Sequence, residues 1–401
     1  MKTIFIAITL LMLITSPTWI HAQEFTLLYS FEDAPDGANP DGGLSVAGNS
    51  GYGTTYHGGA YGYNNQGLGY GTIFKVIASG RETVVHNFAS SPDGANPSGP
   101  LTLDRAGNLY GTTQLGGSGC TPAGCGTVYK IDPAGNETVF YSFQAGTDGA
   151  APYAGVILDS QGNIYGTTMG GGSYGTGTVF RLDTGGHETI LHNFGGPGDG
   201  ADLAGTLVLD SAGNLYGTTL VGGACPQEGG TVFKIDAAGN ETILYSFCGG
   251  ASTGSSPTGN LLRDAAGNLY GVTGQGGNDC PAGDGDGCGT VFELTTSGQL
   301  RVLHAFNGGA TDGAFPTGIT AGVSGILYGS TSAGGSNDTA GLGTLFQLSR
   351  NGFSLIHVFE GGDQDGAMPL APPLFLAGSL YGTTNLGGAS SNGTVYKFAP
   401  K

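Results

Sequence analysis

Carboxylates in turns are the groups in this sequence whose type and spacing first suggest chemistry. An aspartate followed by Gly-Ala recurs at Asp36, Asp93, Asp148, Asp199, Asp312 and Asp365, whereas the corresponding segment 253–257 reads TGSSP. A ring of carboxylates could bind a cation or a basic partner. Asp-Gly is also ordinary turn chemistry, and no single copy spaces several oxygens as a calcium loop requires. We therefore interpret these aspartates as turn residues.

The densest acidic segment contains Asp279, Asp284 and Asp286. These three carboxylates are candidate Ca²⁺ ligands, because Ca²⁺ takes oxygen donors from short flexible segments. The sequence contains no nucleophile elbow, no phosphate-binding loop and no dinucleotide fingerprint. We expect no catalytic residue set and no cofactor, and Ca²⁺ at these aspartates is the one metal hypothesis.

Tyrosines in the glycine-rich segments are the candidate ligand-binding side chains. Aromatic rings can stack on a sugar or provide contact area for a protein partner. The single tryptophan, Trp19, lies in an N-terminal segment that we expect to be removed, and this weakens a lectin assignment. The candidates are Tyr56, Tyr61, Tyr63, Tyr70 and Tyr174.

Six cysteines suit an oxidising compartment and a disulfide framework. Proximity in the sequence favours pairing Cys120 with Cys125 and Cys280 with Cys288, which leaves Cys225 and Cys248. A zinc site is the alternative, but the spacings contain no CxxC pair and no adjacent histidine. We expect disulfides rather than a metal.

A repeat of about fifty-five residues must position all of these groups. The hexapeptide NLYGTT and its relatives place a tyrosine at Tyr52, Tyr110, Tyr165, Tyr216, Tyr270, Tyr328 and Tyr381, with successive spacings between 51 and 58 residues. In the second repeat, four short strands are expected at 99–104, 109–113, 126–132 and 137–143. No amphipathic helical stretch follows residue 22, so the pattern predicts an all-β, seven-bladed β-propeller of four-stranded blades.

The two ends of the repeat array predict how the ring closes. Residues 25–31 (FTLLYSF) form a lone fourth strand, whereas the last repeat stops at a third strand, 393–398. The N-terminal strand can therefore complete the last blade and remove the open edges. We predict a signal peptide at 1–22 and a single seven-bladed domain at 23–401.

Alternating strand directions assign the loops to two faces. The turns after the first and third strands are short and uniform, such as 104–108 (DRAGN). The loops after the second and fourth strands vary strongly, from 385–392 to 56–70, and together they define the variable-loop face. Length variation on a rigid scaffold is typical of a binding surface. Cys225 and Cys248 both fall on this face of one blade.

One fourth-strand position alternates between tyrosine and histidine. Its members, which we call the Tyr/His ring, are Tyr29, His86, Tyr141, His192, Tyr245, His304 and His357. Each member lies on the outermost strand of a different predicted blade, so they are too far apart to form one metal set. We interpret them as a half-packed ring at the rim of the propeller.

Charge and the N-terminal segment indicate export. The net charge of −18 disfavours nucleic acid and anionic membranes as partners. Lys2, an apolar run at 4–14 and Ala22 at the expected cleavage point form a signal-peptide pattern. The run is too short for a membrane span, which takes about 20 apolar residues. We expect a monomer that is secreted, periplasmic or on the cell surface, with no membrane span after signal removal.

In the segments NLYGTT, GTVFK, ETxLYSF and DGAxP the chain resembles the GloVer tandem-repeat family of secreted bacterial proteins, also known as choice-of-anchor repeat proteins. The resemblance covers residues 24–401 and implies an exported, surface-associated repeat protein. Members of that family often carry a C-terminal sorting segment. This sequence departs from that pattern, because it stops at Lys401 directly after a strand with no apolar tail, and this puts covalent or membrane anchoring in doubt.

Three functions follow from these observations. The first is a non-catalytic binding or interaction module for an extracellular polysaccharide or a cell-envelope protein, which uses the variable-loop face. The second is a polysaccharide lyase or hydrolase with a site at the mouth of the central channel. The third is a structural surface scaffold. A rigid scaffold with variable loops and no recognised catalytic set favours the first, and therefore a protein without enzymatic activity.

Overall fold

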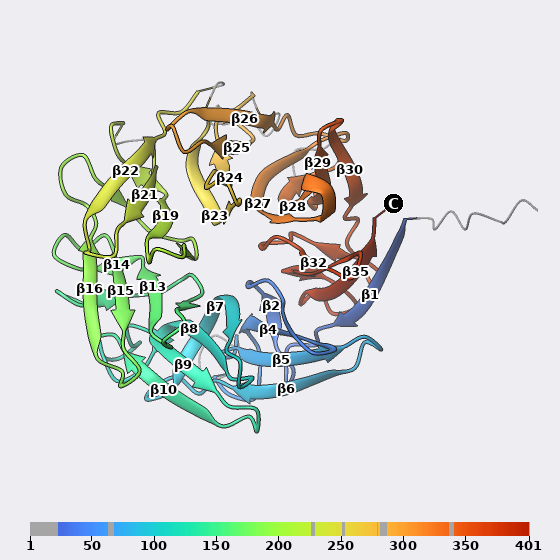
Figure 1. The fold of residues 1–401 in the computed structure, drawn as a ribbon. Helices are drawn as coiled ribbons and strands as arrows, with labels where there is room; N and C mark the ends of the chain where they lie inside the picture. The colour runs from blue at the N-terminus through green and yellow to red at the C-terminus, as the bar shows by residue number, and fades with distance from the viewer. Residues whose placement is uncertain are drawn as a thin grey trace, which may run out of the picture.

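Seven antiparallel sheets follow one another around a ring. The computed structural model describes residues 23–62, 68–225, 229–250, 253–278, 280, 287–336 and 341–400. Figure 1 shows the sheets in chain order, with their first strands toward the centre and their fourth strands at the rim. The one helical element in these ranges is a 3₁₀ turn, η1 (Val323–Gly325). The predicted all-β, seven-bladed β-propeller is confirmed.

The first four blades run from the centre outward in chain order. Blade 1 contains β2 (Ala38–Pro40), β3 (Ser45–Ala47), β4 (Ser50–His57), β5 (Thr72–Ile77) and β6 (Glu82–Asn87). Blade 2 contains β7 (Gly94–Leu103), β8 (Leu109–Gly116), β9 (Thr127–Ile131) and β10 (Glu137–Ser142). Blade 3 contains β12 (Ile157–Leu158), β13 (Ile164–Thr168), β15 (Thr178–Leu182) and β16 (Glu188–Asn193). Blade 4 contains β18 (Val208–Leu209), β19 (Leu215–Thr219), β21 (Thr231–Ile235) and β22 (Glu241–Ser246).

The last three blades repeat this order. Blade 5 contains β23 (Ser255–Arg263), β24 (Leu269–Gln275), β25 (Thr290–Leu294) and β26 (Leu300–Ala305). Blade 6 contains β27 (Gly313–Ala321), β28 (Leu327–Gly334), β29 (Thr344–Ser349) and β30 (Gly352–Val358). Blade 7 contains β32 (Leu374–Leu376), β33 (Ser379–Thr384), β35 (Thr394–Ala399) and β1 (Glu24–Ser30). Three two-stranded sheets pair β11 (Gly149–Ala150) with β14 (Gly170–Gly171), β17 (Gly200–Ala201) with β20 (Val221–Gly222), and β31 (Gly366–Ala367) with β34 (Leu386–Gly387).

Strand β1 closes the ring as the outermost strand of blade 7. It pairs antiparallel with β35, from Glu24 opposite Ala399 to Ser30 opposite Thr394. In Figure 1 the two strands lie side by side, although they come from opposite ends of the chain. The ring of Phe25 stacks on His357 of blade 6, with 4.2 Å between ring centroids, and this contact anchors the closing strand. The closure predicted from the unequal ends of the repeat array is confirmed.

The glycine of LYGTT makes room for an aromatic ring on the third strand. In blade 4, Gly217 of β19 lies opposite Phe233 of β21. A Cβ atom on Gly217 would lie 2.5 Å from Phe233 Cζ. The same relation recurs in every blade, with Tyr129 and Tyr396 in place of phenylalanine in blades 2 and 7. A strand glycine at this position is therefore a packing requirement.

The last threonine of LYGTT hydrogen-bonds the first threonine of the third strand. In blade 1 the hydroxyl groups of Thr55 and Thr72 are 2.9 Å apart, and both residues are fully buried. The pair recurs in all seven blades at 2.7 to 2.9 Å. A buried hydroxyl costs free energy unless it is paired, so the two threonines of each blade require one another.

The uniform turns opposite the variable-loop face are built on aspartate. Asp104 Oδ1 accepts hydrogen bonds from the backbone N–H groups of Ala106 and Asn108, each at 2.9 Å. Its Oδ2 accepts the side-chain amide of Asn108 at 2.6 Å. An aspartate that bonds its own backbone in this way stabilises a tight turn, which explains the repeated DxxGN pattern.

The core is divided into interfaces between neighbouring blades. A phenylalanine directly after each fourth strand is at most 2% exposed: Phe31, Phe88, Phe143, Phe194, Phe247, Phe306 and Phe359. Between blades 3 and 4, the centroid of Phe194 lies 4.8 Å from that of Phe233, beside Val179 and Leu207. Each blade therefore buries both of its faces, and stability depends on the ring being complete.

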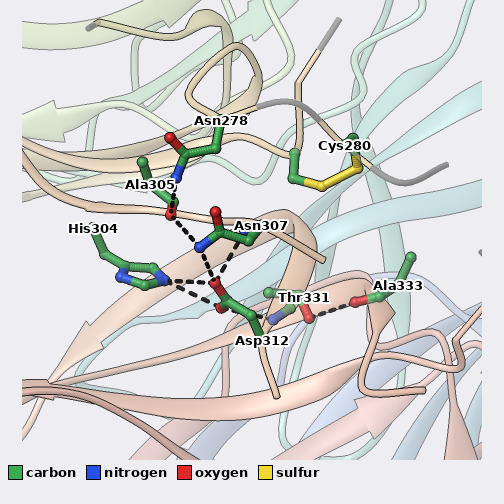
Figure 2. The surroundings of a disulfide bond; sticks show 10 residues. Asn278, Cys280, His304, Ala305, Asn307, Asp312, Thr331 and Ala333 are labelled. Atoms are coloured by element: carbon green, nitrogen blue, oxygen red, sulfur yellow. Dashed lines mark hydrogen bonds and ion pairs between the residues drawn. A yellow bond between two sulfur atoms is a disulfide. The ribbon is translucent and has the colours of Figure 1, made fainter. Parts of the chain in front are cut away.

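Three disulfides tie together segments of the variable-loop face. They join Cys120 to Cys125, Cys225 to Cys248, and Cys280 to Cys288. Figure 2 shows the last of these near His304 and Asp312, at the interface of blades 5 and 6. Disulfides persist in oxidising compartments. Within the described ranges, no helix is long and apolar enough to cross a membrane.

Candidate binding site at the axial cavity

A cavity of about 320 Å³ lies where the seven blades converge, and every blade contributes to its lining. Three lining residues, Leu220, Gly274 and Ser332, directly follow the LYGTT segment, or its equivalent, of a second strand in the sequence. The other lining residues follow the linkers that join a fourth strand to the first strand of the next blade. Both kinds of segment lead to the variable-loop face. The cavity therefore opens toward that face, and its volume lies at the lower end of the range for small-ligand sites.

One position of the repeat supplies different side chains to this cavity. It follows the linker motif DGAxP or its equivalent, and six of its members line the cavity: Asp41, Tyr153, Ala204, Thr258, Thr317 and Leu370. Ser98 occupies the position in blade 2. The residues beside it are small, because neighbouring backbones approach closely: a Cβ atom on Gly42 would lie 2.2 Å from the Gly99 carbonyl oxygen.

Asp41 is the one carboxylate among the described residues that line the cavity. Burial raises the pKa of Asp41 above its usual range, and a hydrogen bond donated by the Tyr153 hydroxyl partly opposes this effect. Burial, followed by the negative charge of Asp41, raises the pKa of Tyr153. Tyr153 therefore stays protonated and acts as a hydrogen-bond donor, and Asp41 keeps an oxygen for a second donor.

Tyr56 and Gln114, which are not lining residues of the cavity, form a polar pair that Asp41 influences. Burial and the charge of Asp41 raise the pKa of Tyr56, so its phenol also stays neutral. The Tyr56 hydroxyl donates a hydrogen bond to the side-chain oxygen of Gln114 in the next blade. Leu220, Phe315 and Leu370 add apolar surface, alongside hydroxyl and amide groups. A mainly apolar wall with a few placed polar groups is typical of a ligand site.

The structure separates the tyrosines that the sequence suggested. Tyr56 lies close enough to Asp41 for its charge to raise the Tyr56 pKa but does not line the cavity, whereas Tyr70 packs into the core between blades 1 and 2. Tyr61 and Tyr174 are 53% and 57% exposed, on loops of blades 1 and 3. Tyr63 lies outside the described residues. The sequence-based set missed Tyr153, although its position after DGAAP in the repeat marked it as a residue at the axis.

The candidate calcium ligands Asp279, Asp284 and Asp286 all lie outside the described residues. In the sequence, Asp284 and Asp286 fall between the disulfide-bonded Cys280 and Cys288, and Asp279 directly precedes Cys280. In the nearby network of Figure 2, Asn278 donates a hydrogen bond to the carbonyl oxygen of Ala305 at 3.1 Å. The calcium hypothesis therefore stays a prediction.

Sequence reasoning did not find the partners of the Tyr/His ring. Six of its seven side chains reach the aspartate of the following Asp-Gly-Ala turn. His86 Nε2 lies 3.3 Å from Asp93 Oδ2, and Asp93 Oδ1 accepts the Gly94 N–H at 2.6 Å. These aspartates thus stabilise turns and also hold the ring. The sequence did carry a sign of this pairing: in six copies the aspartate follows the tyrosine or histidine by seven or eight residues, and Tyr245 is the one member with no such aspartate.

Comparisons with known proteins give one sequence match and a shared fold. The sequence model of the Gloeobacter/Verrucomicrobia repeat matches residues 17–158, 118–341 and 280–401. No curated protein matches the chain. Among solved structures, the extracellular domain of a "putative one component system" from B. thetaiotaomicron aligns with a TM-score of 0.54 and 14% identity over 94% of this chain. The chain spans 42% of that structure's length, and at this identity the likeness shows the fold alone.

A second solved structure, described as a "putative gluconolactonase", aligns with a TM-score of 0.37 and 15% identity. The alignment covers 68% of this chain and 80% of that one. A likeness this weak supports no statement about activity.

Proposed function

The chain belongs to the Gloeobacter/Verrucomicrobia repeat family, and on that premise we propose that it is an exported, non-catalytic binding module that takes part of a polysaccharide into the mouth of its axial cavity. Export rests on the signal-peptide pattern of residues 1–22 and on three disulfides. The fold, the repeat and the loop asymmetry support a surface-binding role.

One observation carries the choice of site. The blades repeat their glycines, threonines and core phenylalanines almost without change, yet they differ from one another where they line the axial cavity. Asp41, Tyr153, Thr258 and Leu370 occupy equivalent positions with four different chemistries. Packing alone would allow one residue type at all of them. A single asymmetric ligand needs different groups around the axis.

The lining matches the chemistry of a sugar. Asp41 offers an acceptor for ligand hydroxyl groups, and Tyr153, whose single O–H is donated to Asp41, offers an aromatic face. Thr206, Asn260 and Ser332 add further hydrogen-bonding groups beside apolar side chains. A pyranose ring presents hydroxyl groups at its edge and C–H groups on its face, so both parts of the wall have a counterpart. The exposed Tyr61 and Tyr174 would contact the chain beyond the cavity.

The lining favours binding over glycoside hydrolysis by two carboxylates. Such hydrolysis uses a pair of carboxyl groups about 5 to 9.5 Å apart. Of the described residues in the cavity wall, Asp41 alone carries a carboxylate, and its neighbour Tyr153 has a raised pKa that makes it a poor base at neutral pH.

The test is a polysaccharide array probed with the oxidised chain 23–401 and with two aspartate variants. Asp41→Ser places at the cavity the residue that blade 2 already carries, Ser98. Asp363→Ser makes the same charge change at an exposed site in a linker of the same face. We expect saturable binding that Asp41→Ser weakens at least about tenfold, equivalent to about 1.4 kcal/mol, and that Asp363→Ser leaves unchanged. Binding that survives Asp41→Ser would move the site off the axis, and no binding on the array would contradict the polysaccharide assignment and favour a protein partner.

A further inference from the structure

Two clusters of side chains at the rim of the propeller, which we call the rim clusters, each bring a histidine and two carboxylates together across a blade interface. In the first, His86 comes from β6 of blade 1, Asp93 from the linker that follows, and Glu137 from the start of β10 in blade 2. In the second, His192, Asp199 and Glu241 occupy the same places in blades 3 and 4. In each cluster one ligand-type atom per residue lies within 4.8 Å of the other two.

The geometry inside each cluster suits a metal ion. The Nε2 atom of His86 lies 3.3 Å from Asp93 Oδ2, and that of His192 lies 3.0 Å from Asp199 Oδ2. Ligands about 2.0 Å from a tetrahedral ion are separated by about 3.3 Å. The glutamate is the third donor, with an oxygen within 4.8 Å of the other two ligand atoms.

Within the described residues, side chains compensate the charge of the clusters only through the histidine and, in the first cluster, through a hydrogen bond between Glu137 and Asp93. Each cluster joins two carboxylates and one imidazole, and no lysine or arginine in the described ranges forms an ion pair with any of them. Glu137 Oε1 and Glu241 Oε1 are enclosed and have no hydrogen-bond partner, as is also true of Glu82 Oε1 and Glu188 Oε1 at the interfaces where a tyrosine replaces the histidine. Enclosed carboxylate oxygens are costly unless a donor or a cation satisfies them. A divalent ion would neutralise both carboxylates at once.

We propose that the clusters His86–Asp93–Glu137 and His192–Asp199–Glu241 each bind one divalent transition-metal ion of the Zn²⁺ type, clamping blade 1 to blade 2 and blade 3 to blade 4. One imidazole nitrogen with two carboxylate oxygens is a donor set for Zn²⁺ and its neighbours. Ca²⁺ is disfavoured, because it takes six to eight oxygen ligands. Three protein ligands leave a fourth position for water.

The other blade interfaces show how the chain manages without an ion. Between blades 2 and 3, Tyr141 replaces the histidine, and its hydroxyl lies 3.2 Å from Asp148 Oδ2 and 3.0 Å from Glu188 Oε2. Burial, followed by the charges of Glu188 and Asp148, raises the pKa of Tyr141, so its hydroxyl keeps its single proton and offers no phenolate to a metal. His86 Nε2, in its neutral form, can offer a lone pair instead.

Between blades 5 and 6, the aromatic side chain of Phe353 takes the place of the glutamate. His304 stacks on Phe353 with 3.8 Å between centroids and keeps its ion pair with Asp312 at 3.1 Å, as Figure 2 shows for the latter pair. Only one carboxylate remains at this interface, so no second negative charge needs an ion. Among the described residues, histidine therefore meets both carboxylates at two interfaces, and these two offer an imidazole nitrogen and two carboxylate oxygens to a metal ion.

These natural versions supply the test variants. His86→Tyr and His192→Tyr install the residue that the chain already carries at Tyr29 and Tyr141, so the fold tolerates it. His304→Tyr is the matched control, because it makes the same change beside Phe353 rather than glutamate. Glu137→Gln removes a ligand charge at nearly constant shape.

The measurement is Zn²⁺ stoichiometry by isothermal titration of the chelator-treated chain 23–401, with Ca²⁺ as a parallel titrant. We expect two Zn²⁺ ions per chain, one after His86→Tyr or Glu137→Gln, none after the double tyrosine variant, and two after His304→Tyr. Zn²⁺ should also raise the melting temperature of the wild type and not that of the double variant. Zn²⁺ binding that is absent, or that the double variant retains in full, would overturn the proposal and leave only adventitious surface binding.

Discussion

Replacing Gly217 by alanine tests whether the glycine of LYGTT is a packing requirement. The backbone of Gly217 does not need a positive φ, so the substitution strains no dihedral angle. Its whole effect must come from the added methyl group, which would lie 2.5 Å from Phe233 Cζ and 2.9 Å from Leu207 Cδ2. Neither neighbour can retreat easily, because Phe233 is fully buried against Phe194 and Leu207 is 3% exposed.

The expected cost follows from the distance that must be recovered. An ordinary carbon–carbon contact is about 3.5 to 4.0 Å, so the Phe233 ring must shift by about 1 Å in a close-packed interface. Forcing an extra methyl into such a core costs about 1 to 3 kcal/mol. We expect about 3 kcal/mol here, which lowers the melting temperature by roughly 3 to 6 °C in a chain of this size.

The control is Gly170→Ala, which adds the same atom to another strand glycine without a positive φ. Its Cβ would lie 3.7 Å from Ala150 Cβ, an ordinary contact. We expect no loss of stability, because alanine also restricts the unfolded chain. Both variants are compared with the wild type by scanning calorimetry under oxidising conditions.

A double-mutant cycle tests the cause. Phe233→Leu alone removes buried atoms and should cost about 1 to 2 kcal/mol. Combined with Gly217→Ala it removes the clash, so the pair should cost at least about 1 kcal/mol less than the sum of the single changes. The packing argument fails if Gly217→Ala has the same melting temperature as Gly170→Ala. It also fails if the free-energy costs of Gly217→Ala and Phe233→Leu simply add in the double variant.

Two further predictions address closure and titration. Deleting residues 24–31 should lower the melting temperature far more than any point change, because the deletion opens blade 7. Phe31→Ala should cost about 3 to 5 kcal/mol of stability, like Phe143→Ala at an internal blade interface. A deleted chain that melts at the wild-type temperature would refute the closure. Burial, followed by the neighbouring Asp148, raises the pKa of Glu188 to about 8 from an ordinary value near 4.5, so the folded state holds a proton that the unfolded chain releases. The stabilisation that this proton provides is complete below about pH 4.5 and is lost as pH rises through about 8. The melting temperature of Glu188→Gln should therefore fall less between pH 5 and 9 than that of the wild type. The control Glu360→Gln, at an exposed position, should follow the wild type.

Local pattern in the sequence was enough to predict the architecture. The strands of one blade are neighbours along the chain, joined by tight turns, so their pairing depends on residues within about 55 positions. The lone strand 25–31 and the missing fourth strand after 393–398 then identified the closing pair, which β1 and β35 form. The three cysteine pairs likewise involve partners within one repeat.

The axial cavity and the rim clusters depend on how whole blades are placed against each other. Asp41 and Tyr153 are more than a hundred residues apart and come from blades 1 and 3, and only convergence at the centre joins them. His86 and Glu137 likewise meet because the rotation between consecutive blades brings their outer strands side by side. Sequence spacing revealed which residues recur, because strand pairing is local. Their partners across blades were decided by tertiary packing, whose distances no short-range pattern records.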